Sequence, residues 1–167
     1  MADLVTHLAS ALLPGVLLPA NRASLLAIGV ALPDVGGRLP SIAAESLPFA
    51  LPPGSLSAFD VLHQPIGLTA AIVATSTLFV PEQRRIVAGW LLSGAALHLA
   101  VDLLQDHHGQ GYHLAFPLSE WRFELGWIGS ESSISWAPWL GLATGVAWAA
   151  RALVSARGRP APAARAR

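Results

Sequence analysis

The sequence predicts an all-α integral membrane bundle of about five helical segments, two or three of them short, with an irregular extracytoplasmic excursion. Hydrophobic residues make up 53% of the 167 residues and charged residues only 12%, whereas soluble domains usually carry about 25% charged residues. Long apolar stretches recur along the chain, separated by segments rich in proline, glycine and polar residues. The net charge of zero gives no indication of a nucleic-acid partner.

Four apolar stretches supply the predicted helices. Residues 8–32 are interrupted by prolines and an Asn-Arg pair, so we expect two short helices folded back on each other. Residues 66–80 form a shorter run that ends before Pro81. Residues 86–104 and 136–154 come closest to the length of about 20 apolar residues that a full membrane crossing needs.

The other segments are predicted to be irregular. Residues 33–59 hold five prolines and three glycines, which favours a loop with no more than one short helix. Residues 106–135 are rich in Gly, His, Trp and Ser and form the predicted excursion. We therefore expect one membrane-embedded domain over residues 1–155, followed by a disordered, arginine-rich cytoplasmic tail over residues 156–167.

The arginines orient this bundle. If the helical segments alternate across a bilayer, eight of the ten basic residues fall on one side, namely Arg22, Arg84, Arg85, Arg151 and the four arginines of the tail. The positive-inside rule makes that side cytoplasmic. The same alternation gathers most of the histidine and aspartate residues on the extracytoplasmic side. Placing such groups near a bilayer costs free energy, so their gathering indicates a functional site.

The strongest local motif is His98-Leu-Ala-Val-Asp102. A spacing of four residues places both side chains on one face of a helix, one turn apart, where two ligands can reach one ion. The alternative is a buried hydrogen bond between His98 and Asp102 that fixes helix packing, and the motif alone does not separate the two. In either case, polar groups inside an apolar segment need partners.

Three further residues lie at the same predicted depth. Asp34 ends an apolar run, and on local grounds it is a helix-ending or turn-capping aspartate. His63 precedes the third helix and His7 begins the first, where each alone is an ordinary helix-start or surface histidine. Together with the His98–Asp102 pair they predict a membrane-embedded metal site, because imidazole and carboxylate groups are ligands that zinc accepts.

A polar, turn-prone run follows the His98–Asp102 helix and contains Asp106, His107, His108 and His113. Its residues are expected to be either solvated loop residues or further ligands, a general base or substrate contacts. Arg122 follows in a stretch rich in aromatic residues, as is typical of a membrane interface. The sequence has no phosphate-binding glycine loop, nucleophile elbow, dinucleotide fingerprint or cysteine, which excludes thiolate chemistry.

Taken in chain order, these residues resemble a bacterial protein family. The shared pattern consists of Thr6-His7, Leu32-Pro33-Asp34, Leu62-His63, His98-Leu-Ala-Val-Asp102, Phe116-Pro117-Leu118-Ser119, Trp121-Arg122-Phe123 and Leu125-Gly126-Trp127. It is similar to that of inner-membrane, metal-dependent hydrolases, a domain of unknown function thought to be distant kin of zinc-dependent phospholipase C and P1-type nucleases. The resemblance covers roughly residues 1–130 and is most specific at the His-x3-Asp helix and the Pro-containing stretch after it.

The resemblance implies a divalent metal cofactor, zinc, and metal-binding roles for His7, Asp34, His63, His98 and Asp102. The chain departs from the family pattern at two positions. Gln64 follows His63 where the family usually has serine, and Gly36 stands where it commonly has a second aspartate. We therefore expect the chain to hold fewer ions than the family pattern, or to recruit His107, His108 or His113.

Through this kinship, the predicted function is hydrolysis of a phosphoester, in a lipid, by a metal-activated water. Asp106 or His108 is expected to act as the general base and Arg122 to contact the phosphate. The predicted location is the bacterial inner membrane, crossed several times, with the site on the extracytoplasmic side and the lipid bilayer as the main partner. The alternatives are a non-enzymatic binding or scaffold protein with a structural His/Asp cluster, and a small ion or proton transporter.

Overall fold

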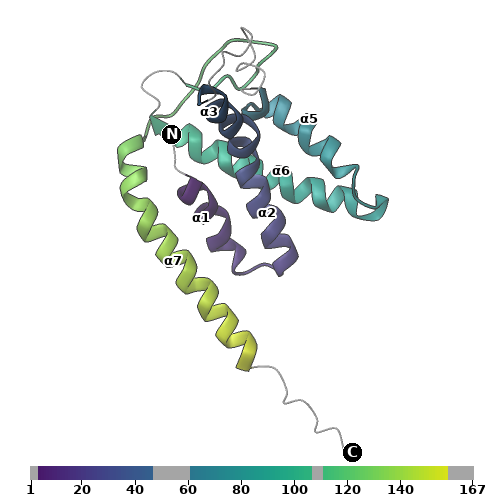
Figure 1. The fold of residues 1–167 in the computed structure, drawn as a ribbon, viewed down its shortest axis with the longest axis vertical. Coiled ribbons are helices and arrows are strands. Elements are labelled where there is room, and N and C mark those ends of the chain that lie inside the picture. The colour runs from purple at the N-terminus through teal and green to yellow at the C-terminus, as the bar shows by residue number, and fades with distance from the viewer. Residues whose placement is uncertain (1–3, 47–60, 107–110, 158–167) are drawn as a thin grey trace, which may run out of the picture.

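The computed structural model describes residues 4–46, 61–106 and 111–157, which are mostly helical (Figure 1). The prediction of an all-α fold is confirmed. The longer helices are α1 (Leu4–Gly15), α2 (Ala20–Pro33), α5 (Pro65–Ser76), α6 (Pro81–Leu104) and α7 (Ser130–Arg157). They pack side by side in the order α7, α1, α2, α6 and α5, so neighbours in space are not always neighbours in sequence.

Helices α1 and α2 form the pair of short helices that the prolines predict. Pro14 lies in the last turn of α1 and Pro19 directly precedes α2, so the chain turns between them. The pair is held by a small apolar core made of Ala11, Leu26 and Val30. Partly buried residues from the following turn and from α6 cover this core, namely Leu18, Trp90 and Leu97.

The segment after α2 holds the one short helix that the prediction allowed, but a π-helix joins it to α2 where a loop was expected. Helix α2 passes into a π-helix, η1 (Asp34–Arg38), and then into α3 (Leu39–Glu45). The amide of Leu39 bonds to the carbonyl of Asp34, and this wider turn shifts the hydrogen-bond register so that Pro40 falls at the start of α3. The rest of the predicted loop, residues 47–59, lies outside the described residues.

Helices α5 and α6 each begin with a proline, Pro65 and Pro81, at a position where the missing amide costs no helical hydrogen bond. Helix α6 therefore starts before the predicted start at Ile86, and α5 ends at Ser76, before the predicted end at Val80. The two helices bury the larger apolar core, which consists of Leu68, Ile72, Val87, Leu91 and Ala95.

Helices α2 and α6 approach each other closely where two glycines face the opposite backbone. A Cβ atom added at Gly29 would lie 2.3 Å from the carbonyl oxygen of Leu91, and one added at Gly94 would lie 2.3 Å from the carbonyl oxygen of Leu26. Both separations are far shorter than van der Waals contact, so this backbone approach requires glycine at both positions.

The connection from α6 to α7 is largely irregular, as predicted, and folds back at one end of the helices (Figure 1). A short parallel pair joins β1 (Gln105–Asp106) to β2 (Ile128–Gly129), and Tyr112 pairs with Phe123 in an antiparallel bridge. Residues 130–135 were expected to be irregular but form the start of α7. An acidic residue in this first turn, Glu131, suits the positive end of the helix dipole.

Among the described residues, two helices, α6 and α7, are long and apolar enough to cross a membrane. Helices α1 and α5 have 12 residues each. Twelve residues give about 18 Å of helix, which is less than a hydrocarbon core of about 30 Å. Residues 156 and 157 of the predicted tail belong to α7, and residues 158–167 lie outside the described part of the chain.

Candidate metal centre

Five buried polar side chains meet at one end of the helical bundle. They come from four separate elements, because α1 supplies His7, η1 supplies Asp34, η2 (Val61–His63) supplies His63, and α6 supplies His98 and Asp102. The close glycine crossing of α2 and α6 lies little more than one helical turn before Asp34 of η1 and His98 of α6. The backbone contact therefore sets the separation of these two sides of the cluster.

The polar atoms of the cluster lie at separations typical of ligands that share an ion. Nε2 of His98 lies 3.2 Å from Nε2 of His63 and 3.1 Å from Oδ2 of Asp102. Nε2 of His63 lies 3.6 Å from Oδ1 of Asp34 and 3.6 Å from Oδ2 of Asp102. Nε2 of His7 lies 3.2 Å from Oδ1 of Asp102. Tetrahedral ligands placed 2.0–2.1 Å from zinc are about 3.3–3.4 Å apart, so these side chains fit shared coordination with small adjustments.

His98 lies at the centre of the cluster, and a contact on the side of its ring that faces away from the cluster fixes its orientation. It belongs to both groups of residues whose ligand atoms lie within 4.8 Å of one another, one with His7 and Asp34 and the other with His63 and Asp102. Its Nδ1 lies 2.8 Å from the carbonyl oxygen of Val30. Because a carbonyl only accepts hydrogen bonds, Nδ1 carries the proton, and the lone pair of the neutral ring is on Nε2, which faces the cluster.

Two buried atoms of the cluster, Nδ1 of His7 and Oδ2 of Asp102, have no hydrogen-bond partner within the described part of the chain. Buried polar atoms are normally hydrogen-bonded, so Oδ2 of Asp102, which lies among the ligand atoms of the histidines, requires an explanation. Oδ2 of Asp102 lies 3.1 Å and 3.6 Å from the Nε2 atoms of His98 and His63, yet it forms no well-aligned hydrogen bond with either. Convergence of these atoms on one point, as around an ion, accounts for short separations without such alignment.

The Asp34 carboxyl is held in its ionised form. Burial opposes ionisation, but the contact with His63 and the charges that His98 and His7 carry when protonated outweigh it, so the pKa of Asp34 lies below its ordinary value. A carboxylate in this form is a ready metal ligand. Asp34 also caps the end of α2, in line with the local interpretation of a helix-ending residue, and the chain continues from it as a π-helix.

The cluster is closest to solvent at Asp34 and His63, which are each 8% exposed, whereas His98 is fully buried. Tyr112 stacks on the His63 ring, with ring centroids 5.5 Å apart and an interplanar angle of 19°. A water molecule or substrate group would therefore reach the cluster between Asp34 and His63, beside Tyr112.

The remaining predicted site residues lie on the excursion. Asp106 is half-buried in β1 and does not belong to the described groups that could share an ion. Arg122 is exposed, and its Nε donates a hydrogen bond to Nε2 of His113 at 2.6 Å. His107 and His108 lie outside the described residues. The base and phosphate-contact roles therefore stay predictions.

Sequence reasoning missed two contributors to the cluster. Tyr112 is 7% exposed, and its pairing with Phe123 ties the excursion to the site. The only available signal was that the chain has a single tyrosine, placed within the polar run after α6. The role of the Val30 carbonyl could not be predicted from the sequence. Every residue has a backbone carbonyl, and only the packing of the helices determines which one contacts His98.

No family model, curated protein or solved structure matches the chain. The kinship with inner-membrane hydrolases therefore remains a proposal.

Proposed function

We propose that the chain is a multi-pass protein of the bacterial inner membrane that hydrolyses a phosphoester, in a lipid, at a zinc centre facing the extracytoplasmic side. The convergence of His7, Asp34, His63, His98 and Asp102 from four elements is the observation that carries this proposal. In a chain with so few charged residues, five such groups brought together in the interior require a compensating partner. A divalent cation is the simplest partner of this chemistry.

The set of donors favours zinc. It consists of imidazole nitrogens and carboxylate oxygens without a thiolate, which is the set used by catalytic zinc sites of hydrolases. A bound zinc ion would supply a water that is deprotonated near neutral pH and a positive charge that stabilises the phosphorane-like transition state. Hydrolysis then forms a bond from the water oxygen to phosphorus and breaks the bond from phosphorus to the alcohol, which leaves with a proton.

The residues of the excursion are assigned the remaining roles. Asp106, or His108, would take the proton of the attacking water, and Arg122 would contact the phosphate oxygens. Arg122 donates to His113 in this structure, so substrate would replace that contact. Exposed apolar residues on the same segment support a position at a lipid surface, and they are Leu118, Trp121 and Trp127.

The location in a membrane is supported by two features. Helices α6 and α7 are long and apolar enough to cross a bilayer, and α7 exposes large apolar residues along its length, among them Trp139 and Val146. Arg22 lies at the opposite end of α2 from Asp34, and Arg85 lies about 20 Å before His98 along α6. Arginines at one end and the cluster at the other are typical of a cytoplasmic and an extracytoplasmic face.

The test measures zinc content and hydrolysis of bis(p-nitrophenyl) phosphate on the purified full chain before and after chelation. We expect chelation to remove both, and zinc to restore both. His98→Ala and Asp102→Asn should each lower zinc affinity by more than about 100-fold, because loss of a ligand exceeds the 10–100-fold effect of losing a supporting hydrogen bond. Glu82→Gln, an exposed carboxylate on the same helix, is the matched control and should bind zinc normally.

Asp106→Ala separates chemistry from metal binding. It should keep its zinc while hydrolysis falls about 10²–10⁴-fold, the usual contribution of a general base. Zinc bound by the wild type without turnover of any phosphoester would instead favour a non-enzymatic membrane scaffold. The near-complete burial of His7, His98 and Asp102 is the observation that favours this second candidate, because structural zinc sites are closed.

A further inference from the structure

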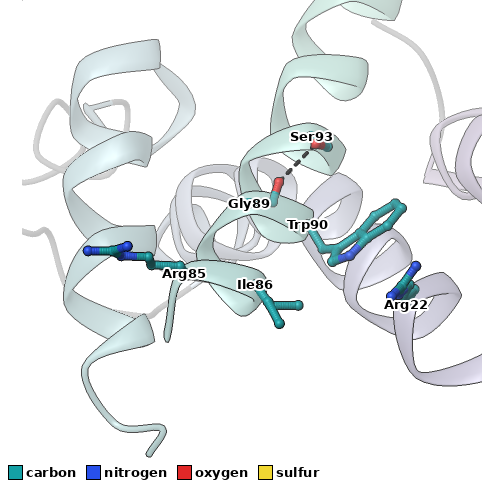
Figure 2. A pocket seen from close by; sticks show the side chains of 6 residues that line it. All are labelled: Arg22, Arg85, Ile86, Gly89, Trp90 and Ser93. Carbon is teal, nitrogen blue, oxygen red and sulfur yellow. Dashed lines mark hydrogen bonds between the residues drawn. The ribbon is translucent and has the colours of Figure 1, made fainter. Parts of the chain in front are cut away.

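A second polar site lies at the opposite end of α2 and α6 from the metal cluster. It is a hollow of about 390 Å³ between the start of α2 and the first half of α6. Figure 2 shows the residues that line it, which are Arg22, Arg85, Ile86, Gly89, Trp90 and Ser93. None of them takes part in the metal cluster.

The hollow carries two positive charges, Arg22 on α2 and Arg85 on α6. Arg22 lies over the ring of Trp90, 6.0 Å from its centroid, and Figure 2 shows Arg85 on the other side of Ile86. Both arginines are exposed, and within the described residues neither forms an ion pair with a carboxylate. Both line the hollow, so an anionic group held in it would be attracted by both.

The floor of the hollow is apolar and open. A Cβ atom added at Gly89 would meet no other atom within 4 Å, so this stretch of α6 presents bare backbone between Ile86 and Trp90. The hydroxyl of Ser93 is already donated to the carbonyl of Gly89, at 2.8 Å. The hollow thus combines two cations with a smooth apolar strip and does not present the many directional donors that a nucleotide or sugar requires.

We propose that this hollow binds an anionic phospholipid, with the phosphate bound by the exposed side chains of Arg22 and Arg85 and one acyl chain along Ile86, Gly89 and Trp90. Basic hollows between membrane helices on the cytoplasmic side are suited to anionic headgroups. The hollow lies at the start of α6, where a candidate membrane-crossing helix leaves the arginine-bearing end. This inference rests on the membrane location in the proposed function and not on zinc binding or hydrolysis.

The test uses the purified full chain in a zwitterionic detergent and counts bound lipids by native mass spectrometry. The probes are dioleoylphosphatidylglycerol, dioleoylphosphatidylcholine with the same acyl chains, and inorganic phosphate as a competitor. We expect phosphatidylglycerol to bind preferentially and inorganic phosphate to displace it poorly. Arg22→Gln and Arg85→Gln should each weaken phosphatidylglycerol binding about fivefold, the effect of one arginine near an anionic lipid surface.

Two matched controls distinguish a loss of lipid binding caused by the hollow from one caused by a change of charge or by a substitution in any helix. Gly89→Leu fills the strip without changing charge and should weaken binding, whereas Gly145→Leu, at an equally open glycine of α7, should not. Arg157→Gln removes the same charge from the end of α7 and should leave binding unchanged.

Equal binding of the two lipids, equal losses in Arg157→Gln and Arg85→Gln, or full displacement by inorganic phosphate would each overturn the lipid site. These readouts do not depend on bound zinc. If lipid does not bind here but zinc is retained, the lipid site is contradicted and the proposed metal centre is not. Extraction of the chain from membranes by alkaline carbonate, without detergent, would instead contradict the membrane location itself.

Discussion

The contact between α2 and α6 differs in kind from the contact between α1 and α7. At the crossing of α2 and α6 the two backbones come into direct contact, because Gly29 and Gly94 have no side chain. Helix α7 instead contacts α1 through long side chains, and Trp148 and Arg151 donate hydrogen bonds to carbonyl groups at the end of α1. One contact is rigid and buried, and the other is partly exposed and adjustable.

This difference matches the location of the candidate metal centre. All five of its residues belong to α1, η1, η2 and α6, and none belongs to α7. Ligands must be held within about 0.5 Å of their coordination geometry, which direct backbone packing can ensure. A helix that contributes no residue to the cluster can tolerate a softer contact. We therefore expect mutations at the first contact to disturb the metal centre and mutations at the second to spare it.

The largest effect is expected from Gly94→Ala. The new methyl group would lie 2.3 Å from the carbonyl oxygen of Leu26, so the two helices must move apart. Overpacking of this kind costs about 1–3 kcal/mol, and the upper half of that range is expected because the obstacle is backbone. Separation of the helices also displaces Asp34 from His98, so zinc affinity should fall together with the unfolding temperature of the zinc-free protein.

Leu26→Ala serves as a control for Gly94→Ala, because it removes apolar packing at the same place without forcing the helices apart. It should lower stability but retain more of the zinc affinity than Gly94→Ala does. If Gly94→Ala bound zinc as tightly as the wild type, the crossing would not be the element that positions the ligands.

The same comparison shows what the sequence could and could not predict. The gathering of His7, Asp34, His63, His98 and Asp102 followed from the alternation of apolar segments, because each residue stands at or near a segment end and alternate ends share a face. The π-helix at Asp34 could not be foreseen, since Pro33 before it and its two glycines favour a loop locally, whereas the packing of this segment against η2 is a tertiary contact. The roles of Gly29 and Gly94 could not be predicted for a similar reason. The local sequence does not show which residue of another helix a glycine will contact.

A smaller effect is expected from Arg151→Gln at the softer contact. Arg151 donates to the carbonyl oxygens of Gly15 and Val16 at 3.1 Å and 2.9 Å and lies 4.8 Å from the centroid of the Trp148 ring. The contact is partly exposed, so its loss should cost about 1 kcal/mol in the free energy of unfolding. Zinc affinity should stay unchanged, because no ligand is attached to α7. Arg157→Gln is the charge-matched control, and a fall in zinc content in Arg151→Gln alone would show that α7 does help to position the cluster.

The smallest effect, and one of opposite sign, is expected from Gly145→Ala in the middle of α7. A Cβ atom there would meet no other atom within 4 Å among the described residues, in contrast to the same change at Gly94. Alanine favours a helix over glycine by about 0.5–1 kcal/mol, so thermal unfolding should shift slightly upward while zinc affinity remains that of the wild type. Because both variants add one methyl group to a helical glycine, their difference isolates the surroundings of each position. A clear loss of stability in Gly145→Ala would mean that a close partner covers this face of α7, most simply a second copy of the chain, and the comparison between a rigid and a soft contact would then hold only for the isolated chain.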